Sequence, residues 1–278
     1  MKFKSIVLSS FAASTLLIAS CGNGDNANNT VANNDSTTVT TAENPITLAE
    51  VTDSKEFNDA TLAIKEIKAE PAGNDSVKVT INYNVGNYTL GAQTEAGVSS
   101  KCNNSDKGQH IHFILDQTPY TALYEPTHSF TVAKNSEHYV MSFLSRSYHE
   151  SVKSKTANVL VKFKIDEAGK LVKLDNPTTP MVFYSRPKGD YVGKDTENLL
   201  LDFYLVNTDL TDGNQVKVNI NGQEYLINNW APKFIQHAPM GTLNVNLQLV
   251  DKDGNALTGD NTTASREIKL AQQEPLNN

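Results

Sequence analysis

Apolar and polar residues alternate along most of the chain beyond about residue 60. Clear runs of this alternation occupy residues 77–85, 111–115, 159–165, 199–205, 216–220 and 243–249. A period of two, bounded by Gly, Asn, Asp or Pro, is typical of half-buried antiparallel strands. No convincing helical stripe of apolar residues follows residue 60, although residues 47–58 could form one short helix. The pattern therefore predicts that the folded part is all-β.

The strand pattern occurs twice. Gly108 and Tyr120 in the first copy correspond to Gly213 and Tyr225 in the second, 105 residues later. The alternating runs of the two copies match at the same offset. Such self-similarity at a fixed offset is the signature of a repeated structural unit. The sequence therefore predicts two copies of one β domain.

The two copies differ by an insertion. Pro71 and Gly73 of the first copy correspond to Pro187 and Gly189 of the second, an offset of 116 instead of 105. The difference predicts about 11 extra residues in the first copy, which we place in an inserted loop at 86–107. Binding residues tend to collect on such loops.

Each copy spans about 100 residues, with six or seven short strands and turn residues every 8–12 positions, which favours tandem immunoglobulin-like β-sandwiches. The Pro-x-Gly sequence near the start of each copy, followed by an alternating strand, resembles that of immunoglobulin-like modules common in bacterial envelope proteins. The strand GQHIHFILD, Gly108–Asp116, resembles a His-rich strand of an uncharacterised family of such modules. The resemblance implies the fold and no known activity. We expect the first sandwich at 59–168, the second at 175–271 and a tail at 272–278.

The N-terminus has the pattern of an export signal. Lys2 and Lys4 precede an apolar stretch over residues 6–18, which is shorter than the roughly 20 apolar residues of a membrane span. The sequence LIASC, which ends at Cys21, resembles a bacterial lipobox. The resemblance implies a lipoprotein signal peptide over residues 1–20 and acylation of Cys21, with palmitate among its chains, as a membrane anchor. An ordinary signal peptide followed by a chance cysteine is the alternative.

The residues after the cysteine predict the location and a spacer. Gly22, instead of Asp, follows Cys21, which favours the outer membrane of the cell envelope, on its periplasmic face or its surface. Residues 22–50 are rich in Asn, Thr, Asp and Ser and contain no aromatic residue. Such a composition buries too little apolar surface to offset the entropy of ordering. We expect a flexible tether over residues 21–58.

Charge and cysteine content narrow the class of partner. The chain has 24 Lys+Arg and 31 Asp+Glu, and it contains no basic run. Phosphate binding needs clustered Lys and Arg, so nucleic acid is not expected as a partner. Two cysteines, one of them at the lipobox, cannot form a disulfide framework.

The best candidate for chemistry is the pair His110 and His112. Alternate residues of a strand lie on one face, about 6.6–6.8 Å apart. Because Ile111 and Phe113 occupy the core face, we expect the histidines to face outward. Two imidazoles so placed can share a zinc or copper ion when other elements add ligands. The alternative is a pair of ordinary solvent-facing histidines. Candidates for further ligands are His128, His138, His149 and Glu150.

A second candidate is the polar and aromatic cluster Arg146, Tyr148, His149 and Glu150 at the end of a strand. In the second copy the corresponding residues, 251–255, form a plain turn by their Asp-Gly dipeptide. The first copy thus replaces a turn with side chains that can contact a ligand. An ordinary exposed loop is the alternative.

Two single residues also stand out. Cys102, in the inserted loop, could be a reactive thiol, an intermolecular disulfide partner, a metal ligand beside His110, or merely a tolerated exposed cysteine. Trp230 is expected to pack in the second core instead of serving as an exposed contact.

No catalytic signature is present: the sequence has no Gly-x-Ser-x-Gly elbow, His-Glu-x-x-His pair, phosphate loop or dinucleotide fingerprint. We therefore do not expect an enzyme. The expected function is that of a membrane-anchored envelope lipoprotein acting as a non-catalytic binding or assembly module for a protein, peptide or glycan partner. The alternative is a copper- or zinc-binding lipoprotein that uses His110 and His112.

Overall fold

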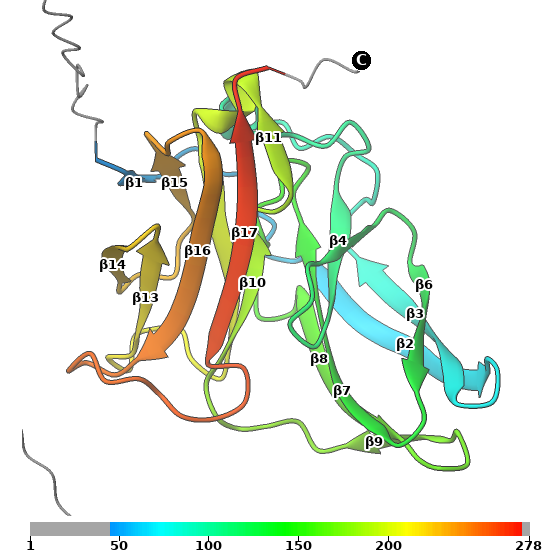
Figure 1. Ribbon diagram of the computed structural model, residues 1–278. Coiled ribbons are helices and arrows are strands. Elements are labelled where there is room, and N and C mark those ends of the chain that lie inside the picture. The colour runs from blue at the N-terminus through cyan, green and yellow to red at the C-terminus, as the bar shows by residue number, and fades with distance from the viewer. Residues whose placement is uncertain (1–44, 274–278) are drawn as a thin grey trace, which may run out of the picture. The chain divides into compact units, whose positions relative to one another are not determined.

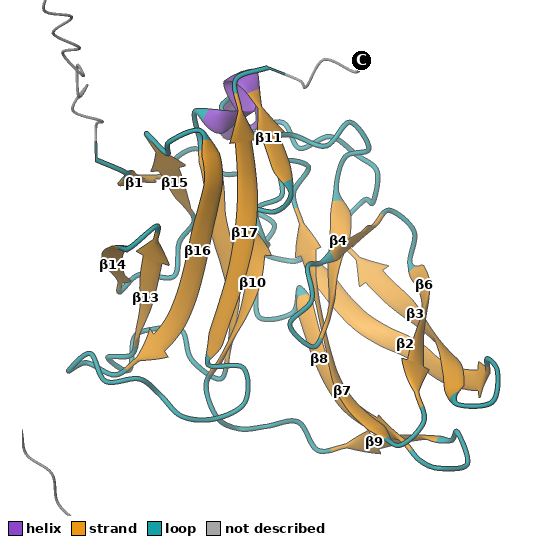
Figure 2. Ribbon diagram, viewed as in Figure 1, coloured by secondary structure: helices purple, strands orange, loops and turns teal. Residues whose placement is uncertain are grey.

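The structure is a computed structural model that describes residues 45–273. The predicted signal peptide, Cys21 and most of the predicted tether lie outside the described residues. Within them the chain forms seventeen strands and two short 3-10 helices, so the predicted all-β class is confirmed (Figures 1 and 2). No helix among these residues is long and apolar enough to cross a membrane.

The first sandwich packs a three-stranded sheet, β2-β3-β6, against a five-stranded sheet, β5-β4-β7-β8-β9. This is the immunoglobulin-like arrangement of strands A, B and E against C′, C, F and G, with β9 added at the edge. The strands are β2 (Thr61–Pro71), β3 (Ser76–Gly86), β4 (His110–Leu115), β5 (Thr121–Leu123), β6 (Thr127–Ala133), β7 (Ser136–Ser145), β8 (Asn158–Ile165) and β9 (Leu171–Leu174).

The second sandwich repeats this order, with the sheet β1-β15-β12-β10 facing the sheet β11-β17-β16-β13-β14. Strands β4 and β13 begin 105 residues apart, as do β7 and β16, so the offset found in the sequence relates equivalent strands. The strands are β1 (Thr47–Glu50), β10 (Met181–Arg186), β11 (Asp190–Val192), β12 (Leu199–Val206), β13 (Gln215–Ile220), β14 (Gln223–Ile227), β15 (Lys233–Gln236), β16 (Gly241–Val250) and β17 (Thr263–Ala271).

Strand β1 departs from the sequence-based expectation. Residues 47–50, assigned to the tether and to a possible short helix, instead form an antiparallel strand on the edge of β15. Leu48 packs against the second core, and Lys233 Nζ lies 2.5 Å from Glu50 Oε1. A four-residue segment has little intrinsic preference, and here the free edge of β15 supplies the hydrogen-bonding template.

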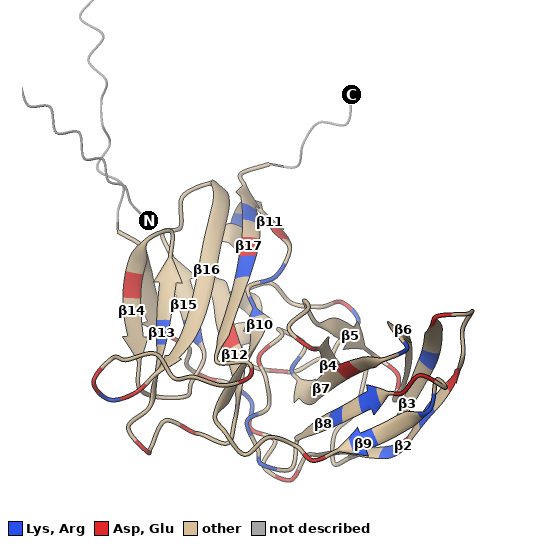
Figure 3. Ribbon diagram, turned by 60° about the horizontal axis from the view of Figure 1, so that its bottom comes forward, with Lys and Arg blue, Asp and Glu red and all other residues tan. Residues whose placement is uncertain are grey.

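Each sandwich has its own apolar core, and a third apolar cluster lies at the junction between them. The junction cluster joins Ile114, Met141 and Phe143 of the first sandwich to Phe183 and Tyr204 of the second. It buries the outer face of β4 and β7 against the outer face of β10 and β12. Charged residues of both signs are scattered over the two sandwiches (Figure 3).

The connection between β3 and β4 spans residues 87–109, whereas its counterpart between β12 and β13 spans 207–214. The longer connection contains the 3-10 helix η1 (Gly97–Ser100), and the other, η2 (Gly193–Thr196), follows β11. The longer connection also lies over the turn that follows β7, because Ser105 N donates to Ser147 O at 2.8 Å and Thr94 N donates to Ser147 Oγ at 3.1 Å. The extra residues thus cover a turn that begins beside the His-bearing strand.

Candidate metal centre at the junction of the two sandwiches

Strand β4 places His110 and His112 on one face and Ile111 and Phe113 on the other. The alternation in the sequence therefore predicts the direction of the side chains correctly. The expectation that these histidines meet solvent is wrong, since both are 0% exposed. The reason is the second sandwich, which covers this face of the sheet.

A third histidine reaches the pair from the turn after β7. The turn closes through Arg146 N, which donates to Glu150 O, and His149 N, which donates to Arg146 O, each at 2.9 Å. His149 has φ +69°, in the left-handed region that His adopts more readily than most residues. Because Ser145 pairs with His110 across the two strands, a turn starting there brings His149 back over His110.

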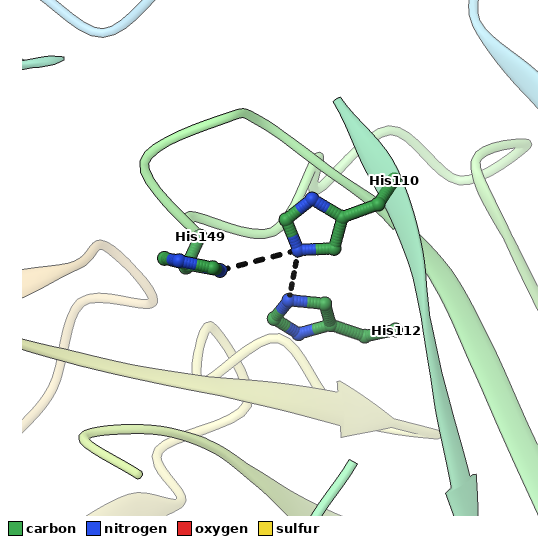
Figure 4. Close-up of side chains that lie close together, drawn as sticks. All are labelled: His110, His112 and His149. Carbon is green, nitrogen blue, oxygen red and sulfur yellow. Dashed lines mark hydrogen bonds between the residues drawn. The ribbon is translucent and has the colours of Figure 1, made fainter. Parts of the chain in front are cut away.

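The three imidazoles converge with their ring nitrogens facing one another (Figure 4). His110 Nε2 lies 2.9 Å from His112 Nε2 and 3.2 Å from His149 Nδ1. The three potential ligand atoms all lie within 4.8 Å of one another. For metal–nitrogen bonds of about 2.0–2.1 Å, ligands at a right angle are about 2.9 Å apart and tetrahedral ligands about 3.3 Å apart. The separations of 2.9 and 3.2 Å are therefore those expected for nitrogens that bind one ion.

The neighbours of the outer ring nitrogens fix the orientation of the imidazoles. His110 Nδ1 lies 2.8 Å from Gly108 O, and since a carbonyl only accepts, Nδ1 carries the proton. The Nε2 atom of the neutral ring then presents its lone pair to the other two histidines. His112 Nδ1 has a comparable neighbour in Ser185 Oγ at 3.0 Å, contributed by the second sandwich. Such outer-ring partners are characteristic of histidines that bind metals.

Burial keeps the three rings neutral. It lowers the pKa of His110 to about 4 and holds the pKa values of His112 and His149 well below their usual range. The positive charges of Arg186 and Lys188 add to this effect on all three. A neutral imidazole offers a lone pair, so the cluster holds the protonation state that metal binding requires.

Aromatic rings surround the three histidines. Tyr120 stacks on His112 with ring centroids 3.6 Å apart, and its hydroxyl lies 3.3 Å from His149 Nδ1. Tyr124 and Phe143 lie against His110 and His112, with centroids at 5.1 and 5.2 Å. The cluster is therefore enclosed by apolar and aromatic groups from several elements.

The predicted ligand-contacting loop is only partly involved. His149 joins the cluster, but Arg146 and Glu150 form an internal ion pair at 3.1 Å with both side chains at most 5% exposed. Arg146 Nε also donates to Lys55 O at 2.7 Å, and Tyr148 is fully buried among apolar residues. The alternative of an ordinary exposed loop is wrong, because the inserted loop and the N-terminal segment pack around these three residues. Arg146 and Glu150 still line a cavity of 380 Å³, together with Trp230.

The other ligand candidates lie apart from the cluster. His128 packs against Phe113, which belongs to the first core, and His138 Nδ1 lies 2.9 Å from Asp116 Oδ2. Cys102 Sγ is 3.7 Å from Val98 O, and burial raises the pKa of its thiol to about 12. These residues are therefore not ligand candidates for this centre.

Trp230 packs as its aromatic character suggested. Its indole nitrogen donates to Phe203 O at 3.0 Å, and its ring meets Tyr204 edge to face with centroids 5.0 Å apart. It is half-buried and touches both the second core and the junction cluster.

Sequence reasoning missed the residues that surround the centre, above all Tyr120, Ser185, Arg186 and Lys188. Ser185 is 73 residues from His112, and no local pattern links the two. Arg186 and Lys188 flank Pro187, which the repeat alignment treats only as a domain entry. The one available signal was the apolar character of Met141 and Phe143 at outward positions of β7, which indicates that this face is covered.

The comparisons with known proteins concern the fold alone. No family model matches this chain, and no curated protein matches it. Among solved structures, the fibronectin(III)-like modules of Clostridium thermocellum CbhA are similar at 15% identity and a TM-score of 0.27, over 76% of this chain and 95% of that one. The two tandem V-type regions of VCBP3, a v-region-containing chitin binding protein, are similar at 9% identity and a TM-score of 0.22, over 76% and 99%. At such scores the likeness carries no argument about the site. The strand order itself defines the chain as an all-β protein with two immunoglobulin-like sandwiches.

Proposed function

We propose that this protein is a non-catalytic metal-binding module that holds one copper or zinc ion between its two sandwiches. The ligands are His110 Nε2, His112 Nε2 and His149 Nδ1. The observation that carries the proposal is the convergence of these three buried nitrogens, two of the separations being 2.9 and 3.2 Å.

Hydrogen bonds among the three imidazoles cannot join all three nitrogens at once. The proton of His110 is on Nδ1, so its Nε2 has one lone pair facing two ring nitrogens. Only one of these nitrogens can donate a well-directed hydrogen bond to that lone pair. Without an ion, the partner of His149 Nδ1 is the Tyr120 hydroxyl at 3.3 Å. An ion bound by all three nitrogens uses the three lone pairs together, and the convergence of those nitrogens is what supports a metal.

The position of the histidines in the repeat also favours a specific role. The second sandwich has Gln215 and Lys217 where the first has His110 and His112, so the strand does not need histidine for its own stability. Burying three imidazoles without a shared partner costs free energy, because each polar ring loses its hydration. A bound ion offsets that cost.

Attachment to the cell envelope belongs to the same proposal. It is supported by the lipobox-like sequence ending at Cys21. The acyl chains on Cys21 would hold the two sandwiches at a membrane surface, with an outer-membrane location favoured by Gly22. Mass spectrometry of the N-terminal peptide from the native protein tests the acylation of Cys21.

The metal is tested on the full-length protein in detergent. Elemental analysis and titration with Cu and Zn salts are expected to give one ion per chain. The variant His110→Gln/His112→Gln/His149→Gln is expected to lose that ion, whereas the control His128→Gln/His138→Gln retains it. Unchanged metal stoichiometry in the triple variant, with wild-type circular dichroism, contradicts the proposal.

A second candidate, a binding module for a peptide or glycan partner, is favoured by one feature. A cleft of 450 Å³ is lined by residues of both sandwiches, among them Lys153, Tyr204, Asp209 and Trp230. Aromatic rings beside polar groups are common in ligand sites. Trp230 is the only tryptophan, so a change in its fluorescence on adding peptides or cell-wall glycans would report binding there.

A further inference from the structure

The candidate ligand set carries no negative charge. Among residues 45–273, the group of His, Cys, Asp and Glu side chains close enough to share an ion consists of the three histidines. The buried carboxylates already have cationic partners, Glu150 with Arg146 at 3.1 Å and Asp202 with Lys153 at 2.6 Å. An ion entering this centre therefore keeps its full charge.

Two basic side chains, Arg186 and Lys188, lie beside the centre. Lys188 Nζ is 4.3 Å and Arg186 Cζ 5.6 Å from the centroid of the Tyr120 ring, which stacks on His112. Their hydrogen bonds go to uncharged acceptors: Lys188 Nζ donates to Tyr120 O and Arg186 Nη1 to Tyr191 OH. Their repulsion of a bound ion is proportional to the charge of that ion, so a divalent ion is repelled twice as strongly as a monovalent one.

Burial penalises a divalent ion further. His110 and His112 are 0% exposed and His149 is 7% exposed. The desolvation cost of an ion grows with the square of its charge, so two charges cost about four times as much as one at similar radius. Zinc is almost always four-coordinate, so beside the three histidines it would need a water as fourth ligand within this buried centre.

We infer that the centre selects copper in its monovalent state, Cu(I), bound by three neutral imidazoles with His110 at the corner. This inference rests on the proposed metal-binding function. Among the metals that imidazole suits, copper is the one with a stable monovalent ion. Alkali cations, also monovalent, prefer oxygen ligands, which this cluster does not provide.

The test compares ions of different charge on the same full-length protein. Under anaerobic reducing conditions, affinities for Cu(I), Ag(I) and Zn(II) are measured by competition with chelators of known affinity. Ag(I) serves as a monovalent ion that needs no reductant. The expected result is one Cu(I) or Ag(I) per chain, retained in the presence of excess Zn(II). Tighter binding of Zn(II) than of Cu(I) overturns the inference and leaves the proposed metal site intact, whereas binding of none of these ions overturns both.

A charge variant tests the electrostatic reason. Lys188→Met removes one positive charge beside the centre and is expected to raise the affinity for both ions. Because the repulsion energy doubles with the charge of the ion, the factor for Zn(II) is the square of the factor for Cu(I). A fivefold gain in affinity for Cu(I) thus corresponds to a gain of about 25-fold for Zn(II). Lys188→Arg keeps the charge and is expected to keep the wild-type ratio of the two affinities. Equal factors for the two ions in Lys188→Met contradict the inference.

Discussion

The two sandwiches share a strand order and register but differ on one face. In the first sandwich His112 pairs with Phe143 across β4 and β7, and both side chains are buried. In the second, Lys217 pairs with Gln248 at the equivalent positions of β13 and β16. Lys217 is 32% exposed and lies 3.9 Å from Glu224. The two strand positions are equivalent. The position in the first sandwich is buried because the second sandwich packs over it, whereas the position in the second sandwich carries a charged residue that remains partly exposed.

The junction uses different sheets of the two sandwiches. The first contributes the outer face of β4 and β7, and the second contributes β10 and β12, which are buried along almost their whole length. Their counterparts β2 and β3 alternate between buried and exposed residues. Because the contact is asymmetric, only one of the two sandwiches acquires a covered histidine face.

The largest expected effect is at the junction itself. Phe143 is fully buried and stacks on Tyr204 with centroids 4.7 Å apart. Phe143→Ala is expected to lower the free energy of unfolding by about 3–5 kcal/mol, through lost burial and the cavity left behind. Gln248→Ala, at the equivalent half-exposed position, is expected to cost less than about 0.5 kcal/mol. Urea unfolding of both variants measures the difference, and similar costs would mean that the sandwiches do not pack as described.

A second comparison concerns the inner faces, where the sandwiches are expected to behave alike. Leu144 and Leu249 are 105 residues apart and both are 0% exposed, each in its own core. Either residue changed to Ala is expected to cost about 2–5 kcal/mol. Neither substitution removes a ligand, so each variant is expected to bind metal with wild-type stoichiometry when folded. A much smaller cost at one position would show that its core is the more loosely packed of the two.

The sequence predicted the strands and the direction of their side chains because both follow from local periodicity and repetition. The offset between Gly108 and Gly213 relates β4 to β13, and the alternation around Ile111 places His110 and His112 away from the first core. These properties depend on neighbouring residues within one strand.

The covering of that face could not be predicted in the same way. Phe183 and Tyr204, which bury it, are about 40 or more residues from the strands they contact. The position of His149 depends on both the pairing of β4 with β7 and the turn that follows. Strand β1 forms on a template edge more than 180 residues away, so its own sequence gave no sign of it. Long-range contacts of this kind leave only indirect signals, such as apolar residues at Met141 and Phe143.

The aligned glycines give a smaller contrast. Gly108 and Gly213 both have positive φ, +80° and +92°. A Cβ at Gly108 would meet Gly91 O and lie 2.5 Å from Ala92 O, whereas at Gly213 its nearest neighbour is Lys252 Cβ at 3.6 Å. Gly213→Ala is therefore expected to cost about 1 kcal/mol, and Gly108→Ala roughly 2–3 kcal/mol.

Only Gly108→Ala is expected to weaken metal binding, because Gly108 O accepts a hydrogen bond from His110 Nδ1. Thermal unfolding and metal affinity measured on both variants test this. Weakened metal binding in Gly213→Ala, or unchanged stability in Gly108→Ala, contradicts the expected contrast.

The smallest expected effect is a difference between β6 and β15, the E strands of the first and second sandwich. His128 of β6 corresponds to Lys233 of β15. Burial lowers the pKa of His128 below its usual 6.5, whereas the equivalent position of the second sandwich has no histidine. When the pH falls below 6.5, the unfolded chain takes up more proton at His128 than the folded protein does, so the histidine lowers stability progressively in acid. The effect is modest, because the ring is only half-buried.

We therefore expect His128→Gln to lose less stability than the wild type between pH 7 and pH 5, and Lys233→Gln to lose as much as the wild type. The measurement is the urea midpoint of each protein at several pH values. All other histidines are common to the three proteins, so the difference in pH slope isolates His128. If the urea midpoint of His128→Gln changes with pH as steeply as that of the wild type, the His128 ring is solvated in the folded protein as it is in the unfolded chain.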